Sequence, residues 1–93
     1  MSIGDSLASA ALDTGIDTSF TLTRDHKIRL AIRTNADTIQ TFERPVDATP
    51  DQWRATDFIS AGSGCAFDEA ISPDWGRGLE YLLRISQRRA ASH

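Results

Sequence analysis

The residue types that most often carry out chemistry are few in this 93-residue chain. It has one cysteine, Cys65, and two histidines, His26 and His93. A nucleophilic site needs a nucleophile, a base and a group that orients the base, all within hydrogen-bond reach. Because His93 is the last residue, only His26 is left as a base, and its polar neighbours are typical of a surface turn. A small enzyme that uses Cys65 or His26 is therefore the least favoured of three functions.

Cys65 follows Gly62-Ser63-Gly64 and begins a short apolar segment. We expect it in the core, because free cysteine is among the most buried residue types. The glycines predict a hairpin turn and not a phosphate cradle, since a strand follows them and no P-loop lysine is present. A single cysteine permits no intrachain disulfide and no thiolate zinc cluster. Cysteine usage is consistent with a cytoplasmic protein, which is the expected location.

Acidic residues offer no convincing site either. Asp68 and Glu69 are adjacent, so in a strand their side chains point to opposite faces and do not form a catalytic pair. With Asp74 they favour a solvated acidic loop. We expect no catalytic residue, no metal and no cofactor.

The basic residues of one predicted strand form a more informative pattern. Ile28, Leu30 and Ile32 alternate with polar positions, which indicates a half-buried strand with one apolar face. Cations about 6.6 Å apart line the other face. The predicted partner-binding residues are Arg24, Lys27, Arg29 and Arg33. This face suits an acidic protein surface or a nucleic-acid phosphate, or it is an ordinary solvated face.

Nucleic acid is the weaker of the two partners. The formal net charge is −3, whereas nucleic-acid-binding domains are usually basic. No aromatic residues alternate with the cations to stack on bases.

The remaining periodicity predicts the elements that position these residues. Alternation indicates strands over 18–23, 27–33 and 38–43, and Pro45 ends the third because it has no N–H to donate to a sheet. Thr49-Pro50-Asp51-Gln52 has helix-start residues in order, which favours a helical turn at 50–55 before strands at 57–60 and 65–68. Whether 50–60 is helix throughout, or a turn followed by a strand, stays open.

A C-terminal amphipathic helix begins at Ser72-Pro73-Asp74. Its sheet-facing stripe contains Leu79 and Leu83, and Glu80 faces away to pair with Arg84. Gly76 and Gly78 are expected to permit close approach to the sheet. Trp53 and Trp75 begin predicted helices. Each should pack in the core, and becomes a binding hot spot if it is exposed.

The chain therefore predicts an α+β fold, with a twisted antiparallel sheet of four to five strands and the C-terminal helix packed on one face. Residues 1–17 form an arm or a short helix over 6–12 that stops at Gly15, and residues 18–93 form a single domain. No apolar run approaches the roughly 20 residues of a membrane helix, so we expect no membrane partner. A homodimer through an edge strand is a further expectation.

Residues 48–83 resemble a bacterial family of small domains of unknown function. The resemblance rests on an Ala-Thr-Pro-Glu-Gln-like start, a Gly-x-Gly hairpin and a Leu-Leu helix end. The matching residues are Ala48 to Gln52, Ile59, Gly62, Gly64, Phe67, Leu82 and Leu83. It implies that the chain is a partner of a small toxin-like protein, and it implies no catalytic residue.

Binding is thus the predicted function. We expect a small non-enzymatic regulatory protein that acts by protein–protein contact, either antitoxin-like or a virus-encoded inhibitor of a host enzyme. The alternative is a nucleic-acid-binding regulator that uses the basic face of strand 27–33.

Overall fold

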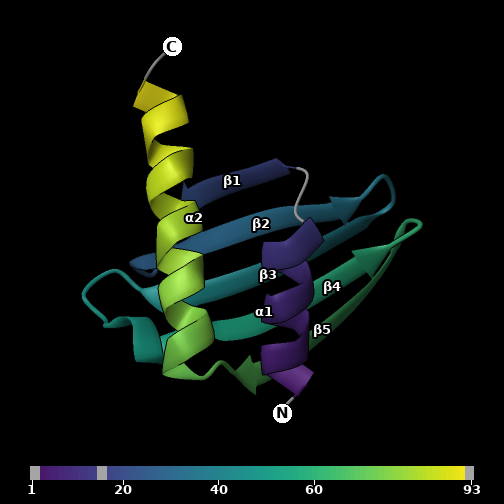
Figure 1. Cartoon of the computed structure of the whole chain (residues 1–93), viewed down its shortest axis with the longest axis horizontal. Coiled ribbons are helices and arrows are strands. Elements are labelled where there is room, and N and C mark those ends of the chain that lie inside the picture. Colours follow the sequence, from purple (N-terminus) through teal and green to yellow (C-terminus); the bar gives the residue numbers. More distant parts are fainter. Residues whose placement is uncertain (1–2, 15–16, 92–93) are drawn as a thin grey trace.

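The computed structural model describes residues 3–14 and 17–91. Within these residues, two α-helices and a 3-10 turn accompany five strands (Figure 1). Their order is α1 (Ile3–Thr14), β1 (Asp17–Leu22), β2 (Lys27–Asn35), β3 (Thr38–Pro45), η1 (Pro50–Gln52), β4 (Arg54–Ser60), β5 (Ser63–Ala70) and α2 (Pro73–Ala91). The α+β class, the antiparallel sheet and the C-terminal helix are confirmed.

The sheet is an antiparallel meander in the order β1-β2-β3-β4-β5. The last hairpin turns at Ala61 and Gly62, whose φ values of 52° and 82° are both positive, so the strands pair directly from Ser60 opposite Ser63. This turn geometry matches the right-handed twist of antiparallel strands. The helical turn expected at 50–55 spans only Pro50–Gln52, because β4 begins at Arg54.

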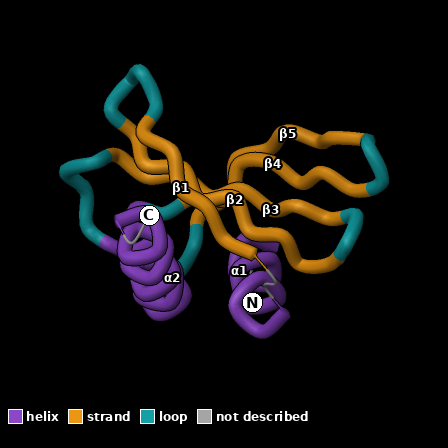
Figure 2. The backbone as a smooth tube through the Cα atoms, turned by 90° about the horizontal axis from the view of Figure 1, so that it is seen from above, coloured by secondary structure: helices purple, strands orange, loops and turns teal. Residues whose placement is uncertain are grey.

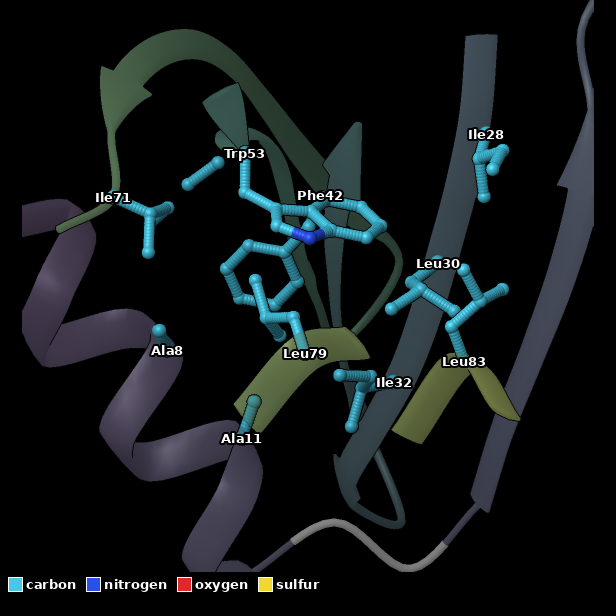
Figure 3. Packing of buried hydrophobic residues seen from close by; sticks show 11 residues of the cluster. Ala8, Ala11, Ile28, Leu30, Ile32, Phe42, Trp53, Ile71, Leu79 and Leu83 are labelled. Carbon is cyan, nitrogen blue, oxygen red and sulfur yellow. The ribbon is translucent and has the colours of Figure 1, made fainter. Parts of the chain in front are cut away.

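Both helices lie on the same face of the sheet, and no helix of the described residues lies on the opposite face (Figure 2). The core fills the layer between them, with Ala8 and Ala11 from α1 and Leu79 from α2 packed against the strands (Figure 3). Its buried hydrophobic residues are Ala8, Ala11, Ile28, Leu30, Ile32, Phe42, Trp53, Ala55, Ile71, Leu79 and Leu83. The alternating apolar residues of β2 face this layer, as expected.

The N-terminal segment is a docked helix and not a loose arm. α1 is longer than the helix expected over 6–12, and its small residues let it approach the sheet, since Ala8 and Ala11 are fully buried. The Asp5 carboxylate accepts a hydrogen bond from the Ser72 N–H (2.7 Å) where α2 begins. Gly15, the expected helix stop, lies outside the described residues.

Gly76 and Gly78 let α2 pack closely against other elements, but those elements are not strands. A Cβ on Gly76 would lie 2.0 Å from the Pro50 carbonyl oxygen of η1, and one on Gly78 would lie 2.7 Å from the Leu12 side chain. The expected approach to the sheet was therefore wrong. The glycines instead bring α2 close to η1 and to α1.

β4 changes register at one point, and buried polar groups stabilise the change. Thr41 pairs with Asp57 whereas Phe42 pairs with Ala55, so Thr56 is an extra residue in β4. The Asp57 carbonyl accepts a hydrogen bond from Gln40 Nε2 (2.6 Å). The bulge keeps Ala55 on the helix side and Asp57 on the opposite side.

Candidate functional site

The candidate site is the face of the sheet that no helix covers, which we call the open face. The cations of β2 lie on it, because Ile28, Leu30 and Ile32 occupy the helix side of the same strand. Arg29 and Arg33 are exposed and Lys27 is half-buried. The structure thus places three of the four predicted partner-binding residues on one uncovered surface.

The charges of the open face are largely paired across strands. Arg29 Nη2 lies 3.3 Å from Glu43 Oε2 on the neighbouring strand, and Arg54 pairs with Asp68 in the same way. Such exposed pairs each contribute only about 0–1 kcal/mol to stability. The Arg33 side chain has no hydrogen bond or ion pair among the residues the structure describes. The face therefore presents a mosaic of both signs and not a continuous basic surface.

A groove of about 460 Å³ lies at one end of the open face. Its walls come from β2, β3, β4, β5 and the η1 turn. The lining residues are Lys27, Glu43, Arg44, Pro45, Asp51, Gln52, Arg54, Thr56 and Asp68. Three basic and three acidic residues share this lining, so a ligand would meet both charges.

The turn between β1 and β2 carries the fourth predicted residue, Arg24, together with His26; both are exposed. His26 adopts a φ of 59°, and the Thr23 hydroxyl donates to Asp25 (2.5 Å). This hydrogen bond, together with a backbone hydrogen bond and the nearby Lys27 ammonium 3.6 Å away, lowers the pKa of Asp25 below its usual value. The turn extends the charged surface beyond the strands.

Cys65 corrects the expectation of a buried thiol, because it is exposed. It lies on β5, which ends the sheet, and only the first part of α1 approaches the helix side there. The structure does not bring Cys65 and His26 together. They belong to hairpins at opposite edges of the sheet.

The two tryptophans differ. Trp53 is fully buried in the core, so it is not available as a surface hot spot, whereas Trp75 is half-buried. Trp53 Nε1 donates to Glu80 Oε2 (2.7 Å) and its ring lies under the Arg44 guanidinium, 5.3 Å from the centroid. The expected pairing of Glu80 with Arg84 was wrong, because Glu80 faces inward to Arg44 and Trp53.

The Arg44 guanidinium makes a polar network that the sequence pattern did not predict. It donates to Glu80 through Nε (2.5 Å) and Nη2 (3.0 Å), and Nη1 donates to the carbonyls of Pro45, Val46 and Ala48. A signal was present, since Arg44 follows Phe42 at i+2 and so falls on the apolar side of β3. A cation there requires a buried acid. The network joins α2 to the 45–48 loop. Its polar groups therefore stabilise the fold and are not free to bind a ligand.

Over residues 3–14 and 17–91 no group of three or more His, Cys, Asp or Glu side chains is arranged to hold a metal ion. Neither described helix is long and apolar enough to cross a membrane. No family model, curated protein or solved structure matches the chain. The resemblance of residues 48–83 to a bacterial family stays a prediction.

Proposed function

We propose that this protein is a non-enzymatic regulatory module that binds another protein through the open face of its sheet. The single observation behind the proposal is that a five-stranded sheet has both helices on one side and a grooved, charged face on the other (Figure 2). A face with strong alternation of charge and no helical cover is suited to a complementary protein surface.

A protein partner fits this surface better than a nucleic acid. Binding to a phosphate backbone relies on cations that are free to replace condensed counterions. On the open face Arg29 is held by Glu43 and Arg54 by Asp68, and acidic residues line half of the charged part of the groove. The proposed action is to cover part of the partner, as an antitoxin or a virus-encoded enzyme inhibitor does.

The test is affinity capture from lysate of the source cell, with the wild-type chain and an Arg29→Glu/Arg33→Glu variant. Both substitutions lie on the open face and should abolish capture of a partner that docks there, by like-charge repulsion. The matched control is Arg84→Glu/Arg89→Glu, which changes the net charge equally on the exposed side of α2. If the Arg29→Glu/Arg33→Glu variant recovers every captured protein as well as the Arg84→Glu/Arg89→Glu control does, the open face is not the binding site.

A salt titration of the captured complex separates protein from nucleic acid. A phosphate-driven complex loses affinity linearly in log salt, by roughly 10³–10⁵ between 50 and 200 mM for six to ten phosphate contacts. The mixed charges of the open face predict a far shallower dependence. A steep linear loss, with nuclease-sensitive capture, would instead establish the nucleic-acid function.

A further inference from the structure

A second groove, of about 370 Å³, lies on the helix side of the sheet between α1 and β5. It is lined by Ile3, Leu7, Phe58, Cys65 and Glu69. Ile3 is 66% exposed although it is a large apolar residue, and Cys65 is exposed as well. The groove is therefore an apolar surface open to solvent, with one carboxylate in its wall.

The groove adjoins a free strand edge. β5 is the last strand of the sheet and contains no lysine, arginine or proline, and its pairing with β4 shifts register between Ala66 and Glu69. Ser60 and Ser63 flank a two-residue turn and form a hydrogen-bonded pair, so the next such pair is Phe58 with Cys65. By this alternation the N–H and C=O groups of Ala66 point outward, away from β4.

The opposite edge is different. β1 is partly covered on its helix side by α2, where the Ser86 hydroxyl donates to the Thr18 carbonyl (3.3 Å), and Leu22 at the end of the strand is 65% exposed. Its side chains on the open face, Asp17, Ser19 and Thr21, are polar and exposed. Of the two edges, β5 is the one that combines free main-chain groups with an apolar groove.

The Glu69 carboxylate indicates the charge of a ligand that would bind in this groove. Glu69 is half-buried in the groove wall, and no described residue forms a hydrogen bond or ion pair with its carboxylate. The adjacent Asp68, on the other face of β5, is paired with Arg54. An acidic group in an apolar wall is complementary to a cation, and the groove lining supplies none.

We propose that the β5 edge and this groove bind an extended segment of another protein, which adds to the sheet as a sixth strand. Main-chain pairing supplies the docking, and alternate side chains enter the groove. The side chain opposite Cys65 is apolar and the one opposite Glu69 is lysine or arginine. Where the added strand follows β5 residue for residue, the recognised pattern is an apolar residue and a basic residue four positions apart, in either order.

This inference shares with the proposed function only the premise that the protein is a binding module, since it concerns a different surface. The probe is a phage-displayed library of random 12-residue peptides, selected on the chain immobilised through a C-terminal tag. We expect enriched peptides with the apolar–basic spacing of four. A fluorescent copy of the most enriched peptide is then titrated with the wild-type chain and its variants by fluorescence polarisation.

Two variants test the contacts and two are matched controls. Ala66→Pro removes one outward N–H, a position where an edge strand tolerates proline, and Ala66→Ser retains it. Glu69→Lys reverses the charge, and Glu69→Asp retains it. We expect about tenfold weaker peptide binding for Ala66→Pro and Glu69→Lys, and near wild-type affinity for Ala66→Ser and Glu69→Asp. Glu69→Lys leaves the backbone unchanged, so it tests the site even where Ala66→Pro lowers the unfolding midpoint.

Three outcomes would overturn the proposal. In the first, the selection enriches no peptides beyond those selected on the Ala66→Pro variant. In the second, the enriched peptides lack the basic residue. In the third, light scattering shows that the wild-type chain is a dimer and the Ala66→Pro variant a monomer, which assigns the β5 edge to a second copy of the chain. The open-face variant Arg29→Glu/Arg33→Glu should bind the peptide normally. Failure of the proposed β5-edge site can therefore be distinguished from failure of the proposed open-face function.

Discussion

Arg44 on β3 and Glu80 on α2 form a two-point ion pair, with Nε 2.5 Å from Oε2 and Nη2 3.0 Å from Oε1. Their side chains are only 9% and 15% exposed, so the pair is largely desolvated. Five hydrogen bonds from one guanidinium leave it well satisfied, which is the condition under which a buried charge is tolerated. The pair links the C-terminal helix to the sheet and to the loop at one end of the open-face groove.

Replacing Glu80 with alanine leaves the Arg44 cation buried without its counter-charge. We expect the free energy of unfolding to fall by about 3–5 kcal/mol. Urea denaturation followed by circular dichroism measures this. The control is Arg84→Ala on the exposed side of the same helix, with an expected change within about 0.5 kcal/mol. Equal effects of the two substitutions would show that the ion pair is not structural.

Trp53→Phe removes the indole N–H that donates to Glu80 and reduces the volume of a fully buried side chain. We expect a loss of about 1–3 kcal/mol in unfolding free energy, from the unmade hydrogen bond and the cavity. Trp75→Phe, at a half-buried position, should cost less. Acrylamide quenching of each single-tryptophan protein checks the placement of the two rings. Acrylamide should quench the fluorescence of Trp53 less than that of Trp75.

Gly76→Ala is expected to destabilise the protein although it improves helix propensity. The helix gains about 1 kcal/mol from alanine, but the new Cβ would lie 2.0 Å from the Pro50 carbonyl oxygen, which belongs to the backbone of η1. Overpacking of this kind costs roughly 1–3 kcal/mol and exceeds the gain when the backbone must move. Thermal unfolding measures the net change. Gly64→Ala, whose Cβ would make only an ordinary 3.6 Å contact with Ile59, is the neutral comparison.

Cys65 should react with a water-soluble thiol reagent in the folded protein, because it is exposed on β5. We expect full labelling under native conditions, at a rate close to that in urea, and a stability change within about 0.5 kcal/mol for Cys65→Ser. Mass spectrometry of the labelled chain gives both the extent and the rate. A thiol that labels only in denaturant would place Cys65 in the core after all. Saturation with the enriched peptide should slow labelling, since Cys65 lines the proposed groove.

Much of the fold follows from local patterns in the chain. The period of two in 27–33 places Ile28 and Arg29 on opposite faces without reference to any other element, because alternation is a property of the extended backbone. The Ser72-Pro73-Asp74 start and the apolar spacing after it predict α2 for the same reason. The hairpin at Ala61-Gly62 follows from Gly62, which accepts a positive φ without strain, whereas the positive φ of Ala61 is not expected from its type.

The same patterns mislead where a residue's environment comes from a distant element. Glu80 was expected to pair with Arg84 one turn later, but Arg44 lies 36 positions away in sequence and reaches it across the helix–sheet interface. Cys65 has the apolar neighbours of a core position, yet of the two described helices only the first part of α1 approaches β5, and Cys65 stays exposed. Neither outcome is encoded in the neighbouring residues.

By itself, the sequence determined which side chains share a strand face or a helix stripe and where the chain turns, since these depend on backbone geometry over a few residues. Only the tertiary structure decided that both helices cover one face, which leaves the cations of β2 on the other. It also decided that α1 docks through its small residues and that the helix side of β5 is left partly open. Those features depend on packing between segments far apart in the chain, where burial and long-range ion pairing outweigh local preference.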